Sequence, residues 1–125
     1  MKMYIKATEF LGILSAYYSE LFGHEVKVES ECYHDIEGYG LNAMPISKVR
    51  FSFETEIKIY NHTVTQTNEL STEDIKDAFS KILEQYDVEN IRNEVCESDR
   101  YNSSLDFIGV ELTLREKQKC MGLRQ

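Results

Sequence analysis

Residues 49–59 read Val-Arg-Phe-Ser-Phe-Glu-Thr-Glu-Ile-Lys-Ile, and this stretch decides the fold class. Apolar and polar side chains alternate along it with the period of two that places the apolar ones on one face of a β-strand. A second alternating stretch, residues 25–32, precedes it. In the antiparallel register that sets Glu31 opposite Arg50, opposite charges face each other across the two strands. The two stretches therefore predict an antiparallel pair with one charged face.

Two amphipathic helices are predicted on either side of this pair. The first has Thr8 as its N-cap and stops at Gly23, and the second opens at Ser71 with a cap-like start and runs to Tyr86. In each helix the apolar residues recur at the three- and four-residue intervals that form one face. These residues are Phe10, Leu11, Leu14, Tyr17, Tyr18, Leu21 and Phe22 in the first helix, and Ile75, Ala78, Phe79, Ile82, Leu83 and Tyr86 in the second.

The other segments are predicted with less regular patterns. Residues 3–7 form a short strand or an extended lead-in, and residues 34–47 form a loop. Residues 61–67 either extend the long strand or form an arm. Residues 91–95 are predicted as a shorter strand, and residues 105–116 as the last strand, with a bulge near Gly109.

The fold class that follows is α+β, in a single domain over residues 1–116. The expected order is α-β-β-α-β-β, with a four-stranded, mainly antiparallel sheet and both helices packed on one face. Residues 117–125 are expected to form a frayed basic tail. Matching positions 64 residues apart also suggest duplicated helix-hairpin units, 1–68 and 69–116, although two amphipathic helices would give the same matches without duplication.

The charge of the chain is uneven. The formal net charge is −8, and residues 69–99 alone contain ten acidic and three basic residues. Such a surface repels nucleic acid and anionic membranes and attracts basic protein surfaces. The predicted partner-binding residues lie at the end of the second helix and on the next strand: Glu84, Asp87, Glu89, Glu94, Glu97 and Asp99. The alternative is a solvated surface that only keeps the protein in solution.

A second contact surface is predicted in the glycine-containing loop, at Glu37, Tyr39 and Asn42. The same region supports an alternative function, a small-molecule-binding protein or a small enzyme that uses the loop around His34. Cys32 and His34 lie two residues apart, but no second pair of metal ligands follows at a recognisable spacing. We therefore predict no catalytic residue, no metal and no cofactor.

The three cysteines are an odd number without a CxxC spacing, which favours reduced thiols and a cytoplasmic location. The apolar run at residues 10–14 is too short for a signal peptide or a membrane span.

In size, acidity and α+β make-up the chain resembles small accessory proteins of phages and mobile elements, among them anti-CRISPR proteins. The resemblance implies an inhibitor that occludes a basic, nucleic-acid-binding surface of a partner protein. The leading interpretation is thus a small acidic, non-enzymatic protein-binding module that contacts neither nucleic acid nor membrane directly. A homodimeric structural subunit, joined through an open sheet edge or through the uncovered face of the sheet, is a further alternative.

Overall fold

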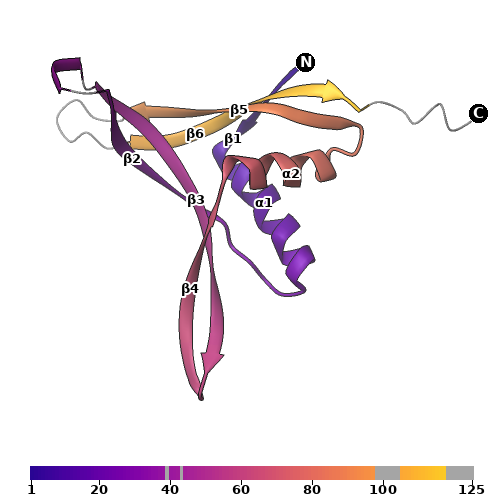
Figure 1. The fold of residues 1–125 in the computed structure, drawn as a ribbon. Helices are drawn as coiled ribbons and strands as arrows, with labels where there is room; N and C mark the ends of the chain where they lie inside the picture. Colours follow the sequence, from indigo (N-terminus) through magenta and orange to yellow (C-terminus); the bar gives the residue numbers. More distant parts are fainter. Residues whose placement is uncertain (39, 43, 98–104, 118–125) are drawn as a thin grey trace, which may run out of the picture.

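The computed structural model describes residues 1–38, 40–42, 44–97 and 105–117, and its helices and strands are shown in Figure 1. The elements, in chain order, are β1 (Lys2–Lys6), α1 (Ala7–Phe22), β2 (Glu29–Glu37), a short 3-10 helix (Gly40–Asn42), β3 (Met44–Ile59), β4 (His62–Leu70), α2 (Thr72–Ile82), β5 (Tyr86–Glu97) and β6 (Leu105–Glu116). The fold is therefore α+β, as predicted, but a strand precedes α1 and a further strand, β4, precedes α2.

The strands form two three-stranded sheets, with the orders β1-β6-β5 and β2-β3-β4, and every neighbouring pair is antiparallel. The predicted four-stranded sheet is wrong. Alternation along a strand shows which side chains share a face, but it does not identify the neighbouring strand. The extra strands β1 and β4 each complete a separate sheet, one at the edge of β6 and one at the edge of β3.

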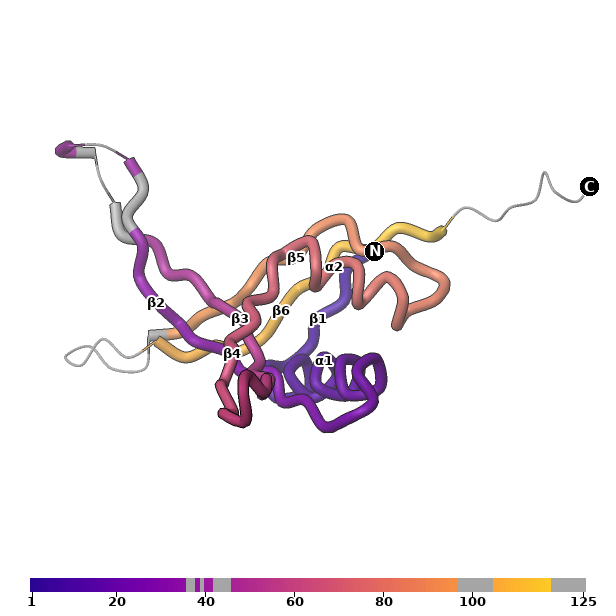
Figure 2. Tube along the Cα trace, turned by 60° about the horizontal axis from the view of Figure 1, so that its bottom comes forward, coloured from indigo at the N-terminus to yellow at the C-terminus, as the bar shows by residue number. Residues whose placement is uncertain are grey.

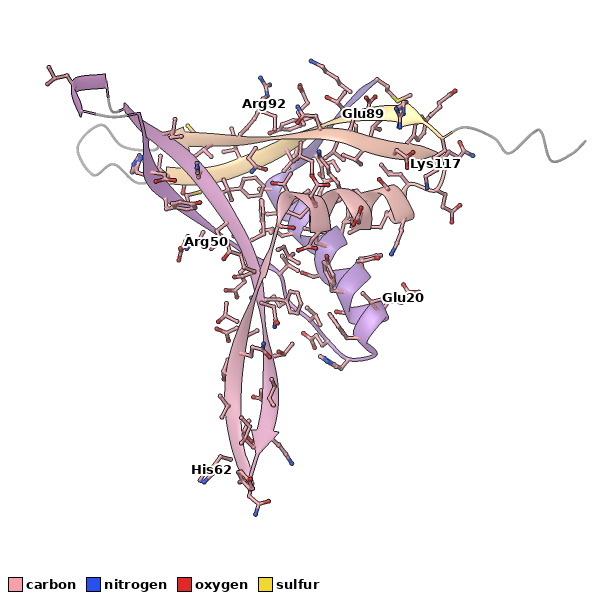
Figure 3. The ribbon with its side chains drawn as sticks, in the orientation of Figure 1. Glu20, Arg50, His62, Glu89, Arg92 and Lys117 are labelled. Carbon is pink, nitrogen blue, oxygen red and sulfur yellow. The ribbon has the colours of Figure 1, made fainter. Side chains whose placement is uncertain are left out.

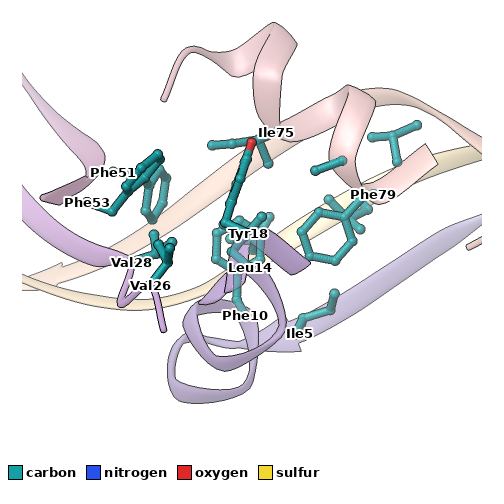
Figure 4. Packing of buried hydrophobic residues seen from close by; sticks show 14 of the residues in the cluster. Ile5, Phe10, Leu14, Tyr18, Val26, Val28, Phe51, Phe53, Ile75 and Phe79 are labelled. Atoms are coloured by element: carbon teal, nitrogen blue, oxygen red, sulfur yellow. The ribbon is translucent and has the colours of Figure 1, made fainter. Parts of the chain in front are cut away.

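Both helices lie on the same side of the β1-β6-β5 sheet, and the second sheet crosses beside them (Figures 1 and 2). The core lies in this space. Phe10 of α1 is fully buried, and its ring lies 5.2 Å from that of Phe79 in α2, 5.3 Å from Phe51 in β3 and 6.0 Å from Phe107 in β6. One side chain thus joins both helices to both sheets (Figure 4).

The predicted register of β2 and β3 is confirmed. Glu31 lies opposite Arg50, and the Arg50 Nη1 is 3.1 Å from the Glu31 Oε1. The predicted loop over residues 34–47 is wrong, because β2 continues to Glu37 and β3 begins at Met44. His34 pairs with Ser47 in this ladder, and the Lys48 ammonium lies 3.0 Å from the carboxylate of Asp35. A cross-strand ion pair of this kind supports pairing well beyond the point where the apolar alternation ends.

Two serines of α1 hold the segment that leads into β2. The backbone N–H of Val26 donates to the Ser19 hydroxyl at 2.7 Å, and that of Val28 donates to the Ser15 hydroxyl at 2.9 Å. Both valines are buried, as their alternation predicts, but they precede the strand, which begins at Glu29. Side-chain hydroxyls satisfy their buried N–H groups in place of a sheet ladder.

The β3–β4 hairpin extends away from the rest of the molecule (Figure 1), and we call its outer part, residues 54–67, the arm. Tyr60 and Asn61 form its two-residue turn, with φ values of +48° and +68°. Two central residues with positive φ are typical of the type I′ turn, whose twist suits a hairpin. Of the two predictions for residues 61–67, the arm is confirmed.

The predicted bulge near Gly109 is also confirmed. The β5–β6 register shifts so that Glu94 faces Gly109 while Val95 faces Phe107. The shift turns Phe107 into the core and leaves Ile108 exposed. A Cβ on Gly109 would lie only 2.8 Å from the Ile5 carbonyl oxygen, so the close approach of β1 at this point requires glycine.

The helix ends differ in part from the prediction. At α2 the capping box is present: the Asp74 N–H donates to the Ser71 hydroxyl at 3.1 Å, and the Ser71 N–H donates to the Asp74 carboxylate at 2.9 Å. At α1 the N-cap is Lys6, which makes no side-chain cap, and the prediction of Thr8 is wrong. The end of α2 at Tyr86 is also wrong, because the helix stops at Ile82 and Tyr86 begins β5.

The C-terminal segment is described only as far as Lys117. Its ammonium donates to the Ser80 carbonyl oxygen at 2.7 Å, and its N–H donates to the Gln85 carbonyl oxygen at 3.0 Å. These two bonds join Lys117 to the folded domain, so the prediction of a frayed tail does not hold at that residue, and residues 118–125 lie outside the described part. The predicted boundary of the duplicated units, between residues 68 and 69, falls inside β4, and the duplication stays a prediction.

Candidate functional site

The six acidic residues predicted to bind a partner do not lie together. Glu84 is in the turn between α2 and β5, Asp87 and Glu89 are in the first part of β5, Glu94 is near its middle and Glu97 is its last residue. Ten residues of strand separate Asp87 from Glu97, a distance of about 33 Å at roughly 3.3 Å per residue. Asp99 lies outside the described residues. Acids that are close in sequence are spread by an extended strand, which also turns alternate side chains to opposite faces.

The middle of β5 is electrostatically compensated. The Arg92 guanidinium lies 3.3 Å from the Glu94 carboxylate and 3.6 Å from that of Glu111, and the Lys2 ammonium lies 3.6 Å from Glu111 as well. In contrast, Glu84, Asp87 and Glu89 form no salt bridge with any residue that the structure describes. Among the β5 acids whose side chains the structure describes, those without a salt bridge therefore lie at the α2 end, where Arg115 of β6 is opposite Asp87.

An open groove of about 600 Å³ begins at this end, between the C-terminal parts of the two helices. Tyr17, Leu21 and Ile82 provide its apolar surface, and Glu20, Lys81 and Glu84 its charged groups. Glu84 is the only one of the six predicted acids among these lining residues. Figure 3 shows Glu20 at the outer side of α1, far from Glu89 on β5.

Two local features form the groove: the spacing of its residues along α1 and the positive φ of Glu84 after α2. Tyr17, Glu20 and Leu21 are separated by three and four residues, so they share one face of α1. On the other side, α2 ends at Ile82 and Glu84 has a φ of +46°, which ends the helical path and begins the turn into β5. The Leu21 side chain is 60% exposed and the neighbouring Phe22 47% exposed, so the end of α1 presents apolar surface to solvent.

Tyr18 lies buried beside this groove, between the two helices. Burial raises the pKa of its hydroxyl above the ordinary value, and the negative charges of Asp74 and Asp77 raise it further, as does Tyr17.

The raised pKa of Tyr18 predicts a loss of stability in alkaline solution. Above pH ~10 the tyrosine ionises in the unfolded chain but stays protonated in the folded one, so the unfolded state binds fewer protons and the free energy of unfolding falls as the pH rises. Tyr18→Phe removes this ionisation and should flatten the alkaline decline. Urea unfolding of the wild-type and Tyr18→Phe proteins between pH 8 and pH 11 measures this decline. An equal fall of the free energy of unfolding with pH in both proteins would contradict the raised pKa of Tyr18.

The second predicted contact surface is described only in part. Glu37 ends β2, Asn42 belongs to the short 3-10 helix, and Tyr39 lies outside the described residues. His34, on which the alternative of an enzyme depends, is an exposed residue in the middle of a strand ladder. Across the described ranges, no group of three or more histidine, cysteine or acidic side chains is arranged to hold a metal. Burial, and to a smaller extent Asp106, raise the pKa of the Cys32 thiol, which lowers the fraction of reactive thiolate at neutral pH.

A further cleft, of about 510 Å³, separates β5 from β3 and the start of α2, and its lining includes Lys48, Arg50 and Arg92. These cations are compensated. Arg50 lies between Glu31 and Glu69, at 3.1 and 3.3 Å, with its guanidinium 4.6 Å from the centre of the Tyr33 ring. These contacts join β2, β3 and β4 within one sheet, and they leave little charge to attract an anion.

Comparisons with protein-family models, with curated proteins and with solved structures found no significant match for this chain. None of the helices in the described part is long and apolar enough to span a membrane. The function of the candidate site is therefore inferred from its geometry alone.

Most of the groove was not predicted from the sequence, namely its lining by Tyr17, Glu20, Leu21 and Ile82. One signal was present. Nine of the thirteen residues from Phe10 to Phe22 are apolar or aromatic, which is more than one core-facing stripe of a helix needs. The excess widens the apolar stripe, so that Tyr17 and Leu21 line the groove at one edge while Phe22 packs against Tyr18 and Phe53 at the other.

Proposed function

We propose that the protein is a non-enzymatic protein-binding module that receives a basic segment of a partner protein in the groove between α1 and α2. One observation carries the proposal: the exposed Leu21 and the half-buried Tyr17 and Ile82 line the same groove as two carboxylates. These carboxylates, Glu20 and Glu84, make no salt bridge with described residues. Among the described residues of the lining, Lys81 is the one basic group beside two acidic ones, which leaves this set of side chains with a net negative charge.

The apolar and the acidic side chains of the groove would contribute differently to binding. Tyr17, Leu21 and Ile82 gain stability when an apolar partner side chain displaces water from them. Glu20 and Glu84 attract lysine or arginine at the rim, which speeds the encounter and fixes the orientation more than it adds affinity. A segment with apolar residues on one face and basic residues beside them fits this arrangement, as an amphipathic helix does.

Acidic residues beyond the groove would also attract a basic partner. Asp87 and Glu89 follow Glu84 along the chain but lie outside the groove, so they would add only to the long-range attraction of a basic partner. When the basic surface of the partner is one that binds nucleic acid, the bound chain excludes that nucleic acid by volume and by charge. Inhibition by occlusion is the form of this function that needs no catalytic residue.

The experiment is capture of a partner from an extract of the protein's own cells, at about 50 and about 300 mM salt. At the higher ionic strength the Debye length falls below ~10 Å, so a contact guided by exposed charges weakens. We expect a partner with a basic surface that is retained at the lower salt concentration and reduced at the higher one. Partners retained equally at both concentrations would contradict the role of the carboxylates.

A further inference from the structure

The arm has surfaces that its own chain does not cover. β4 is the last strand of its sheet, and its first six residues, from His62 to Thr67, are exposed. Beyond Ser52, β3 also lacks a neighbour on its β2 side, so the arm is a two-stranded ribbon with two open edges. Isolated two-stranded ribbons are marginally stable in water.

The two faces of the arm differ in character. In the observed register Ile57 faces Val64 and Ile59 faces His62, so these side chains share one face. Ile57, Ile59 and Val64 are 43%, 49% and 45% exposed. Glu56 and Lys58 lie on the opposite face, opposite Thr65 and Thr63. Figure 3 shows His62 at the tip, far from the core.

The free edge of β4 lacks the features that usually prevent strand addition. Natural edge strands are protected by lysine, proline, bulges or short length. β4 is nine residues long, pairs with β3 in an unbroken register and contains neither lysine nor proline. Its only charged residue is Glu69, at the end nearest the body.

The turn determines which backbone groups are free. In a two-residue hairpin the residues beside the turn, Ile59 and His62, form a hydrogen-bonded pair, and such pairs alternate with non-bonded ones. Val64 and Gln66 therefore bond to β3, as His62 does. Thr63, Thr65 and Thr67 direct their N–H and C=O groups toward the open edge.

We propose that the open edge of β4 pairs antiparallel with β4 of a second copy of this chain, with Thr65 opposite Thr65 of the other copy. The twofold axis then sets Thr63 opposite Thr67, so threonines face threonines across the junction, a favourable cross-strand pair. The two three-stranded sheets become one six-stranded sheet, and the apolar faces of the two arms join into a single strip.

The absence of charge on the outer part of β4 permits a second copy as the occupant. Each chain carries a net charge of −8, so copies repel one another wherever acidic surfaces meet. Residues 59–68 are ten consecutive positions without an acidic residue, lysine or arginine. In the proposed register Glu69 faces Asn61 of the other copy, and no like charges lie opposite each other. The junction is thus the kind of contact that two strongly acidic chains can make.

The first test is the sedimentation mass of the wild-type chain at about 10–100 μM. We expect twice the chain mass of 14.6 kDa. The dimer should persist or strengthen when salt is raised, because screening reduces the repulsion between the two bodies while the junction itself is uncharged. Partner capture is expected to weaken as salt is raised, whereas the dimer is not. The dimer and the proposed function can therefore fail separately. A mass of one chain across this range would overturn the dimer.

Two variants locate the junction. Thr65→Pro removes an N–H that points to the open edge and leaves the β3–β4 bonds in place, so we expect a single-chain mass. Thr65→Val keeps that N–H and should keep the dimer. If Thr65→Pro sediments as a dimer while its circular dichroism matches the wild type, the β4 edge is not the interface.

Cysteine variants test the register without depending on the proline variant. Hydrogen-bonded antiparallel pairs have Cα atoms about 5.5 Å apart, within the range that a disulfide spans. Under oxidised glutathione Thr65→Cys should therefore form a covalent dimer much faster than the wild-type chain, which has the same three native cysteines. Thr67→Cys is the matched control, because its opposite residue is Thr63. Equal cross-linking of both variants would overturn the proposed register.

Discussion

Replacing Phe10 by alanine is expected to remove most of the stability of the fold. The ring is fully buried and lies within about 6 Å of three other rings, from α2, β3 and β6. Truncating a buried phenylalanine costs about 3–5 kcal/mol, and domains of this size are stable by about 5–15 kcal/mol. Because Phe10 joins both sheets and both helices, its neighbours cannot close the cavity without separating elsewhere.

Urea unfolding followed by circular dichroism measures this loss. Leu21→Ala is the matched control, since Leu21 lies on the same helix and is 60% exposed, and its free energy of unfolding should fall by less than about 1 kcal/mol. Equal, small losses for Phe10→Ala and Leu21→Ala would show that the helices do not pack around Phe10 as described.

Reversing the two groove carboxylates, Glu20→Lys with Glu84→Lys, is expected to weaken partner binding by an order of magnitude or more. An exposed ion pair contributes up to about 1 kcal/mol, and reversal replaces each attraction by repulsion, while about 1.4 kcal/mol corresponds to a tenfold change in Kd. The fold should be retained, because both residues are exposed and a cation near the C-terminus of α1 suits the helix dipole.

The matched control makes the same change of net charge elsewhere, as Glu9→Lys with Asp106→Lys. Glu9 lies eleven residues before Glu20 in α1, about 16 Å along the helix axis, and Asp106 lies in β6. Isothermal titration with the captured partner should show a small change for this control. If both double variants lose the same affinity, only the net charge matters and the groove is not the contact.

The sequence predicted those parts of the fold that follow from local periodicity. The alternation of residues 49–59 gave β3, the cross-strand charges gave its register with β2, and the apolar spacing in α1 and α2 gave both helices. It did not reveal that the strands divide into two sheets, because pairing of β1 with β6 joins residues more than a hundred positions apart. Nothing in five residues of β1 specifies so distant a neighbour.

The candidate site was less predictable than the fold. Counting acids along residues 69–99 located Glu84, but an extended β5 separates the others, and Arg92 compensates Glu94. Glu20 lies 64 residues before Glu84 and joins it only because α1 and α2 pack beside each other. Which acids share a surface is a property of helix packing and of the turn at Glu84, and neither has a clear signal in the chain.

The most direct test of the proposed function is a ¹⁵N–¹H NMR titration of the protein with the captured partner. We expect amide shifts to change most at Tyr17, Glu20, Leu21, Ile82 and Glu84, with changes in the arm no larger than in the rest of the body. Changes confined to the arm or to the outer face of the β1-β6-β5 sheet would contradict the groove as the binding site.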